Sequence, residues 1–322
     1  MSAVSGGHMP KKFRFGVPLP GLPSAQEWAG WARQAEDLGY DIALIPDHFG
    51  EQLAPIPALT AAACATTTLR IGTLVLGNDY RHPVMVAKEA ATLDVLSNGR
   101  FELGLGAGWM VSDYERSGMQ FDRPGVRVSR LEESIAVIKG LLGAGPFSYE
   151  GTYYRIADLD GYPKPLQHPH LPILVGGGGP RMLKIAAREA DIIALHPSLR
   201  RTRNGASMLQ RAMWDATPEA FDEKIQQLSD SLGDRLGQTE LNSVIYLPLI
   251  RDDTDTAAQE AAEQLGVSPN EARQCPLIVI GTASEVADVL QQRRERYGIS
   301  YYLVKQPWME EFAPVVAKLA GK

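Results

Sequence analysis

Short apolar segments and longer amphipathic segments alternate along almost the whole of this 322-residue chain. The apolar segments are rich in Val, Ile and Leu, which is typical of parallel strands that are buried on both faces. Each is followed by a stretch with helical periodicity, and about eight such strand-then-helix units can be recognised. This pattern predicts an α/β protein. At this length it favours a (β/α)8 barrel, or TIM barrel, with insertion segments, over an open doubly wound sheet.

The alternation can be divided into individual elements. The predicted strands are Phe13–Pro18, Asp41–Pro46, Leu69–Leu76, Phe101–Leu105, Ile173–Val175, Asp191–Leu195, Val244–Ile250 and Ser300–Val304. The predicted helices are Ser24–Leu38, Pro55–Thr66, Pro83–Ser97, Val126–Leu142, a segment after Pro180, Pro218–Leu232, Thr256–Leu265, Ser284–Tyr297 and a closing helix. The expected insertions are a hairpin at Phe147–Ile156 and an Arg-rich connector at Arg200–Asn204, and a further apolar stretch lies at Leu277–Ile280.

No low-complexity linker divides the chain, so we expect residues 11–322 to form a single barrel domain. Residues 1–10 contain Gly7-His8-Met9, which looks like a cloning remnant. We expect this segment either to derive from the cloning vector or to be disordered.

Composition narrows the function classes. The net charge of −6 does not favour nucleic acid or an anionic membrane surface as a partner. Two cysteines, Cys64 and Cys275, stand far apart, which fits a reducing cytoplasm and suggests neither a disulfide framework nor a zinc site. No apolar run approaches the roughly 18 residues that a membrane span needs, and no dense group of His, Asp and Glu predicts a metal site. We expect a cytoplasmic protein that acts on a small molecule.

A run of glycines follows one predicted strand directly. Gly176, Gly177, Gly178 and Gly179 lie between Ile173–Val175 and a helix that begins with Pro180 and Arg181. Glycines let backbone N–H groups approach an anion closely, and a helix N-terminus adds partial positive charge. Arg181 adds a fork of donors. The segment therefore favours phosphate binding over the alternative, a plain flexible turn.

Polar and aromatic residues follow other predicted strands, where the active sites of (β/α)8 barrels are built. Asp47, His48 and Phe49 follow the second strand, and His196 ends the strand after the glycine run. His48 can donate, accept or carry charge near neutral pH. The structural alternatives are that Asp47 caps a turn, that His48 packs there, and that His196 is a satisfied structural histidine.

Further glycines lie at the end of the fourth predicted strand and directly after it. The segment Gly104–Gly108 leads into Trp109 and lacks the acidic residue of a dinucleotide-binding fingerprint. We interpret these glycines as permitting close backbone approach to a flat ring. Of the remaining histidines, His82 is a weaker candidate for a contact, and His168 and His170 are expected in solvated turns.

Together these segments resemble the bacterial luciferase-like flavin and deazaflavin superfamily, and most of all its coenzyme F420-dependent oxidoreductase branch. The matching motifs are RFGVPLP at the start, PDHF at Pro46–Phe49, the run LRIGTLVLGNDYRHPVMVAKEAATLDVLSNGRFELGLGAGW over Leu69–Trp109, PILVGGGGPRMLKIAAREAD from Pro172 and GTASEVADVL from Gly281. The long central run is specific to the superfamily, and PDHF favours the deazaflavin branch.

The resemblance implies a cofactor at the carboxyl ends of the barrel strands and a non-prolyl cis peptide at Leu74–Val75 behind its ring. It further implies that Asp47 and His48 approach the ring. Three residues, Ala107, Gly108 and Ser112, are then expected along the cofactor's polar side chain, with Gly177, Gly178, Gly179 and Pro180 holding its phosphate. Trp109 stands where some sugar-phosphate dehydrogenases of the family carry an acidic residue. This departure argues against sugar-phosphate oxidation and favours a larger or less polar substrate.

The expected activity is hydride transfer between C5 of F420 and an unsaturated or carbonyl-like carbon. His48 and Asp47 are the catalytic candidates beside the ring, His196 or Tyr114 would deliver a proton, and Trp109, Phe49 and His196 would line the substrate pocket. The connector around Arg200–Ser207 is a candidate lid. The alternatives are an FMN-dependent monooxygenase on the same barrel and a non-catalytic flavin- or deazaflavin-binding protein. The resemblance also favours a homodimer.

Overall fold

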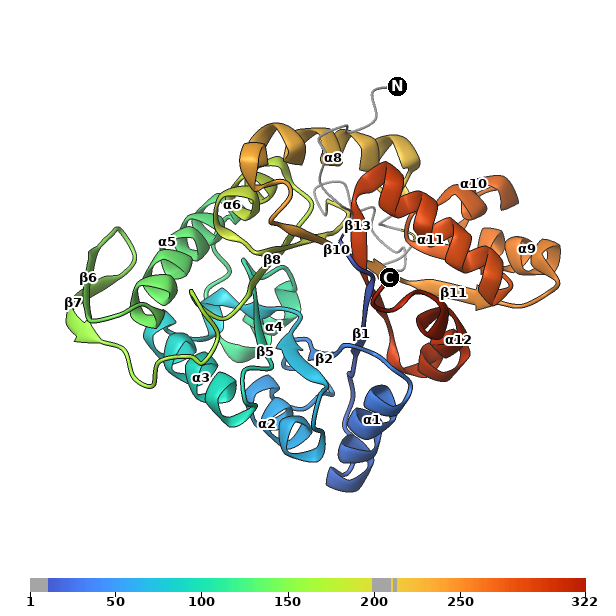
Figure 1. Cartoon of the computed structure of the whole chain (residues 1–322). Helices are drawn as coiled ribbons and strands as arrows, with labels where there is room; N and C mark the ends of the chain where they lie inside the picture. The colour runs from blue at the N-terminus through green and yellow to red at the C-terminus, as the bar shows by residue number, and fades with distance from the viewer. Residues whose placement is uncertain (1–10, 199–209, 211–212) are drawn as a thin grey trace. The chain divides into compact units, whose positions relative to one another are not determined.

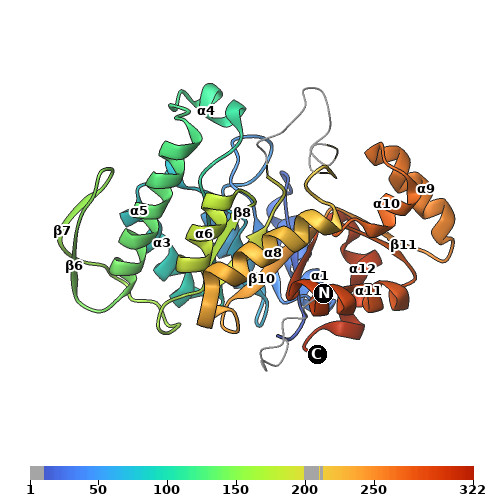
Figure 2. The same ribbon diagram turned by 90° about the horizontal axis from the view of Figure 1, so that it is seen from above.

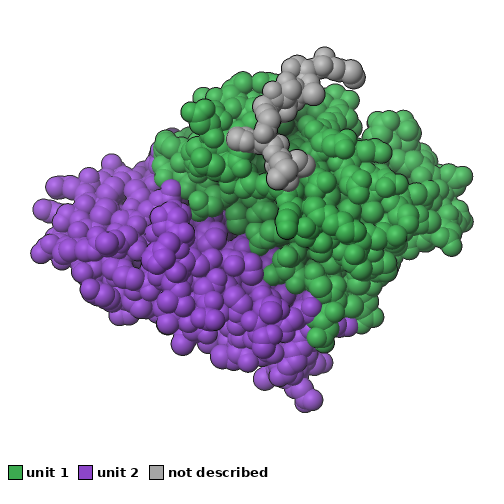
Figure 3. All heavy atoms as spheres, viewed as in Figure 1, with its two compact units in different colours: residues 1–17, 37–41, 177–322 green, residues 18–36, 42–176 purple. Residues whose placement is uncertain are grey.

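The computed structural model describes residues 11–198, 210 and 213–322, so the predicted N-terminal segment 1–10 and the connector 200–207 lie outside the described residues. Contacts divide the chain into two compact units, shown in Figure 3. Unit 1 comprises the chain up to Val17, Asp37–Asp41 and Gly177–Lys322, and unit 2 comprises Pro18–Glu36 and Ile42–Gly176.

Unit 2 contains parallel strands with helices between them. Its strands are β2 (Ile42–Ile45), β3 (Arg70–Thr73), β4 (Leu76–Gly77), β5 (Phe101–Gly106) and most of β8 (Ile173–Gly177). β3 pairs in parallel with β2 and β5, and β5 pairs in parallel with β4 and β8. Every residue of β2 and β5 is buried, as expected for strands covered on both faces.

Helices and one hairpin complete unit 2. They are α1 (Ala25–Asp37), α2 (Pro55–Ala65), the 3-10 turn η1 (Asn78–Tyr80), α3 (Pro83–Leu96), α4 (Val111–Ser117), α5 (Pro124–Leu142) and the antiparallel pair β6 (Pro146–Glu150) and β7 (Arg155–Asp160). α3 and α5 pack against each other (Figure 1 and Figure 2). Proline occupies the first turn of α2, α3 and α5, where its missing N–H costs nothing.

Unit 1 has a parallel sheet in which β13 (Ile299–Val304) pairs with β1 (Arg14–Pro18) and β10 (Glu240–Ile245), and β10 pairs with β9 (Ile192–Leu195). A separate parallel pair consists of β11 (Leu247–Ile250) and β12 (Ile278–Gly281). The helices are α6 (Pro180–Glu189), α8 (Pro218–Leu232), η3 (Gly233–Arg235), α9 (Thr254–Leu265), α10 (Pro269–Gln274), α11 (Ala283–Tyr297), η4 (Gln306–Trp308) and α12 (Met309–Leu319).

The alternation of parallel strands and helices along the chain confirms the predicted α/β class and the (β/α)8 barrel fold. The single-domain boundary at residues 11–322 stays a prediction. Within the described residues no helix has the length and hydropathy to cross a membrane.

One predicted strand is wrong in its extent. The segment Val244–Ile250 was expected to form a single strand, but it breaks at Tyr246 into β10 and β11, and β11 pairs with β12 instead of continuing the sheet of β10. Pro248 lies in β11 and has no N–H to donate, which suits a strand with one pairing partner better than a central strand. The apolar stretch at Leu277–Ile280 is therefore the partner of an insertion.

The end of α1 is tied to the start of β3 through one carboxylate. Glu36 Oε1 accepts hydrogen bonds from the backbone N–H groups of Thr67, Thr68 and Leu69 at 2.5–2.9 Å. Burial alone would raise the pKa of Glu36, but the hydrogen bonds from Thr68 and Leu69 outweigh it and lower this pKa to about 2. The ionised carboxylate therefore stabilises the fold.

We expect Glu36→Gln to lower the free energy of unfolding at pH 7 by about 1–2 kcal/mol, because a charged acceptor is replaced by a neutral one. The pKa of Glu36 is lowered in the folded state, so its contribution is complete above pH 4.5 and is lost as the pH falls toward about 2. Urea unfolding between pH 7 and pH 3 should thus show the two proteins converging. Asp37→Asn, at the neighbouring exposed position, is the control, and a difference independent of pH would contradict the assignment.

Candidate active site

Asp47 follows β2 and is held by other parts of unit 2. Its side chain is only 3% exposed and pairs with the guanidinium of Arg81, at 2.5 Å to Oδ2 and 3.3 Å to Oδ1. The backbone N–H of Gly77 also donates to Oδ2, at 3.0 Å. Both carboxylate oxygens therefore have partners within the protein, and Asp47 fixes Arg81 and the end of β4. Its approach to a cofactor ring stays a prediction.

His48 lies next to a carboxylate that the sequence analysis did not select. Its Nδ1 is 2.7 Å from Oδ2 of Asp113, which lies in the first turn of α4 and has a side chain 5% exposed. Asp113 also accepts from the backbone N–H of Phe49 and from the Tyr80 hydroxyl. Because a carboxylate only accepts, Nδ1 of His48 carries the proton in this contact, and Nε2 is left to exchange protons with another group.

Two exposed aromatic side chains accompany this pair. Trp109, 40% exposed, meets the His48 ring edge to face with centroids 5.7 Å apart. Phe49, 50% exposed, packs against Tyr80 with ring centroids at 4.7 Å. Large exposed aromatic side chains beside a histidine are the composition expected of a binding surface for an organic molecule.

Tyr114 does not suit the proton-donor role considered for it. It is fully buried, and its hydroxyl donates to Asp79 Oδ2 at 3.1 Å. Burial and the neighbouring Asp79 raise its pKa, which makes proton release harder. Arg130 pairs with the other oxygen of Asp79 at 2.8 Å. Tyr114 therefore supports the loop after β5 from behind.

The glycines of β5 also have a different role from the expected one. A Cβ on Gly104 would lie 2.0 Å from the Thr73 carbonyl oxygen, and one on Gly106 would lie 2.5 Å from Val75 Cγ2. These glycines thus admit the neighbouring strand segment rather than a ligand ring. That segment contains a cis peptide bond between Leu74 and Val75, which the resemblance implies and the structure confirms.

The loop after β5 is fixed through its carbonyl groups. Arg127, buried in α5, donates to the carbonyl oxygens of Ala107 at 3.2 Å and Gly108 at 3.4 Å. Gly108 has φ of 73°, and a Cβ there would lie 2.0 Å from the Tyr114 hydroxyl. Ser112 is exposed in the first turn of α4. The sequence pattern predicted no helix between Trp109 and Val126, so α4 is an element that sequence reasoning missed.

The glycine run ends in the predicted helix start. Gly179 is the N-cap of α6 and Pro180 occupies its first turn, as the sequence indicates. A Cβ on Gly178 would lie 1.9 Å from the carbonyl oxygen of His196, whereas one on Gly179 would meet nothing within 4 Å. Arg181 is exposed and Gly176 half-buried. The open space at Gly179, beside the N–H groups that begin α6, is suited to an anion.

His196 lies beside this run in unit 1. Its backbone N–H donates to the Gly177 carbonyl oxygen at 3.3 Å. Burial lowers the pKa of His196 to about 4, so its ring is neutral at physiological pH. The neutral ring of His196 can therefore donate one hydrogen bond through its N–H but carries no charge.

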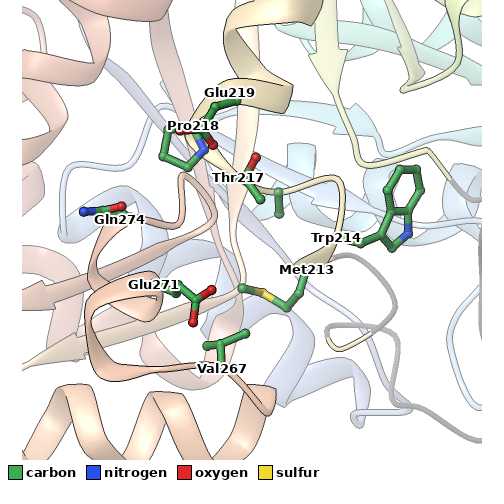
Figure 4. A pocket seen from close by; sticks show the side chains of 9 residues that line it. Met213, Trp214, Thr217, Pro218, Glu219, Val267, Glu271 and Gln274 are labelled. Carbon is green, nitrogen blue, oxygen red and sulfur yellow. The ribbon is translucent and has the colours of Figure 1, made fainter.

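A cavity of about 300 Å³ lies elsewhere in unit 1, between the start of α8 and α10. Figure 4 shows Met213, Trp214, Glu219 and Glu271 among its lining side chains. None of the predicted site residues lines it. Among the described residues no group of three His, Cys, Asp or Glu side chains is placed to hold a metal ion.

Sequence reasoning missed Arg81, Asp113 and Arg127. The available signal was position, because Arg81 and Asp113 follow strands of the predicted barrel, as Asp47 does. Arg127 and Asp113 lie on helices, where a charged residue ordinarily indicates a solvated face.

Comparison with known proteins identifies the family. The profile of the luciferase-like monooxygenase family matches residues 7–301, so the chain belongs to that family. It is 33% identical over 169 residues to an F420-dependent glucose-6-phosphate dehydrogenase of Amycolatopsis mediterranei, covering 50% of each chain. It is 28% identical over 185 residues to a 5,10-methylenetetrahydromethanopterin reductase of Archaeoglobus fulgidus, covering 58% of this chain and 53% of the relative.

These matches span about half the length of the curated relatives. A solved structure extends the similarity of fold to nearly the whole chain. The coenzyme F420-dependent tetrahydromethanopterin reductase from Methanopyrus kandleri superposes with a TM-score of 0.73 at 20% identity, covering 96% of this chain and 99% of the other. At this identity the likeness establishes the (β/α)8 fold alone.

The His48–Asp113 contact predicts a single tautomer for neutral His48, with the proton on Nδ1. Asp113→Asn should give a mixture of tautomers, because an amide can either accept from Nδ1–H or donate to bare Nδ1. Long-range ¹H–¹⁵N spectra of histidine-labelled protein distinguish the two forms. Asp252→Asn, at an exposed position in unit 1, is the control. A protonated Nε2 in neutral His48 of the unmodified protein would contradict the prediction.

Proposed function

We propose that this protein is a coenzyme F420-dependent oxidoreductase that transfers a hydride between the cofactor and an unsaturated or carbonyl-like carbon of an organic substrate. The observation that carries the proposal is the His48–Asp113 pair beside exposed Trp109, in a chain whose relatives include F420-dependent enzymes. When bound, the deazaflavin would supply a two-electron hydride carrier at C5.

The residues present fit such a cofactor in two respects. The N-terminus of α6 offers backbone donors at Gly179, where a Cβ would meet only open space, and this suits a phosphate. The loop Ala107–Gly108 is held from behind by Arg127, which leaves the loop preorganised. We assign Gly176, Gly177, Gly178, Gly179, Pro180 and Arg181 to the phosphate, and Ala107, Gly108 and Ser112 to the polar side chain.

The chain's own contribution to the reaction centres on His48. Asp113 orients its ring and keeps the proton on Nδ1, so that Nε2 can accept a proton from, or return one to, the reacting molecule. Trp109 and Phe49 would exclude water from the reacting atoms. His196, neutral at physiological pH, remains a candidate substrate contact. Tyr114 is a weaker candidate for the proton donor, because its hydroxyl is buried and donates to Asp79.

The substrate is then a small organic molecule. Trp109 stands where some sugar-phosphate dehydrogenases of the family carry an acidic residue. This argues against a sugar phosphate, the substrate named for the dehydrogenase relatives, as the substrate of this protein. A homodimer and a cytoplasmic location remain predictions.

Titration of the protein with F420 and with FMN, followed by fluorescence, tests the cofactor assignment. We expect saturable binding of F420, with FMN at least about tenfold weaker, a difference of about 1.4 kcal/mol in binding free energy. Saturation by FMN alone, together with oxygen consumption in the presence of reduced FMN, would favour the monooxygenase alternative. Tight F420 binding without turnover on a broad panel of substrates would favour a non-catalytic binding protein.

Gly179→Ala tests the phosphate site. The added methyl group would meet no protein atom within 4 Å, and the φ of −88° suits alanine, so the unfolding temperature should hardly change. Affinity for F420 should fall about tenfold or more, because the methyl group occupies the space where the anion approaches the backbone. Gly30→Ala on α1, also in open space, is the matched control. Equal F420 affinity of both variants would move the phosphate elsewhere.

A further inference from the structure

Three polar side chains follow three adjacent strands of the sheet in unit 1. His196 follows β9, Tyr246 follows β10 and Lys305 follows β13. All three are half-buried. The Lys305 ammonium nitrogen lies 5.4 Å from the centroid of the Tyr246 ring.

Strand register places His196 and Lys305 on one face of this sheet. Val244 of β10 is in register with Leu303 of β13, and the pairing of Ser243 with Leu195 sets His196 level with Val244. Side chains alternate along a strand, so Lys305, two residues beyond Leu303, shares this face. Tyr246 follows the end of β10, and its ring lies beside the Lys305 ammonium group. Lys305 keeps an extended backbone, with φ of −64° and ψ of 148°.

The opposite face of the sheet is covered by helices. Phe15 of β1 is in register with Tyr302 of β13, and the Phe15 ring packs on Phe312 of α12 with centroids 5.9 Å apart. The face that carries His196 and Lys305 is therefore the one turned away from α12. In a (β/α)8 fold this is the inner face of the sheet. Residues that directly follow the barrel strands are the ones that contact ligands.

These three side chains lack partners in the described part of the chain. None of the three has a side-chain hydrogen bond or an ion pair there, the aromatic contact of Lys305 with Tyr246 aside. Burial lowers the pKa of Lys305 and raises that of Tyr246 to about 12, with no neighbouring charge contributing to either shift. Polar groups that burial removes from water ordinarily need hydrogen-bond partners, and a bound organic molecule can supply them.

We propose that Lys305, Tyr246 and His196 form a binding site for the carboxylate group of an organic ligand. All three can donate a hydrogen bond at neutral pH, so the matching group is rich in acceptors. Only Lys305 among them is charged, so one negative charge is balanced, which suits a monocarboxylate better than a phosphate dianion. Tyr246 supplies an aromatic surface beside the ammonium group.

This inference deepens the proposed function, because it takes the carboxylate to belong to the organic substrate. The probes are 3-phenylpropionate, its primary amide and phenyl phosphate, titrated calorimetrically into the cofactor-free protein at matched ionic strength. We expect 3-phenylpropionate to saturate the protein and the other two to bind at least about tenfold more weakly. Neither measurement depends on F420.

Variants locate the binding. Lys305→Met should weaken binding of 3-phenylpropionate at least about tenfold, Lys305→Arg should retain most of it, and Tyr246→Phe should weaken it several-fold. Lys318→Met, at an exposed position on α12, is the matched control and should bind as the unmodified protein does. The Lys305→Arg variant also shows whether weaker binding by Lys305→Met is caused by loss of the positive charge or by misfolding.

Equal affinity for the acid and its amide, unchanged affinity in Lys305→Met, tighter binding of phenyl phosphate, or no saturable binding of 3-phenylpropionate to the unmodified protein would each overturn the assignment. The F420 titration separates the two proposals. Carboxylate binding without F420 binding would contradict the cofactor assignment alone, and F420 binding without carboxylate selectivity would contradict this site alone.

Discussion

Three buried carboxylates determine how the loops of unit 2 are arranged. The side chains of Asp47, Asp79 and Asp113 are 3%, 6% and 5% exposed. A buried charge is costly unless it is paired and hydrogen-bonded, so each must have its partner in place when the chain folds. The partners, Arg81, Arg130 and His48, come from other segments of the sequence. Pairing these charges therefore fixes the loops after β2, β4 and β5 to one another.

This constraint explains which groups are left for a ligand. Asp47 and Tyr114 are polar residues at favourable positions, yet each is already hydrogen-bonded within the protein. What remains accessible is the Nε2 side of His48 and the exposed faces of Trp109 and Phe49. A reactive imidazole on a rigid carboxylate support, next to apolar surface, is the kind of preorganised arrangement that acid–base chemistry requires.

Local patterns explain what could be predicted from the sequence. Helix α8 occupies the predicted range Pro218–Leu232, and Pro180 begins α6 as expected, because periodicity and capping act within a few residues. The glycines of β5 were identified, but their use was not: the Thr73 carbonyl oxygen fills the space at Gly104, and only the fold brings it there. The Asp113–His48 contact joins residues 65 apart and the Arg81–Asp47 pair residues 34 apart. No local pattern encodes such pairings.

Lys305 is a residue whose relevance the sequence does not reveal. In the sequence it is an ordinary lysine after a strand, and lysines are mostly solvated. Its interest arises only when register sets it on the same face as His196 and beside the Tyr246 ring, with no carboxylate of the described residues paired to it. In unit 2 the buried carboxylates of Asp47, Asp79 and Asp113 are paired within the protein, so they support the site. Polar groups that the described protein leaves without partners are the better indicators of what a ligand must bring.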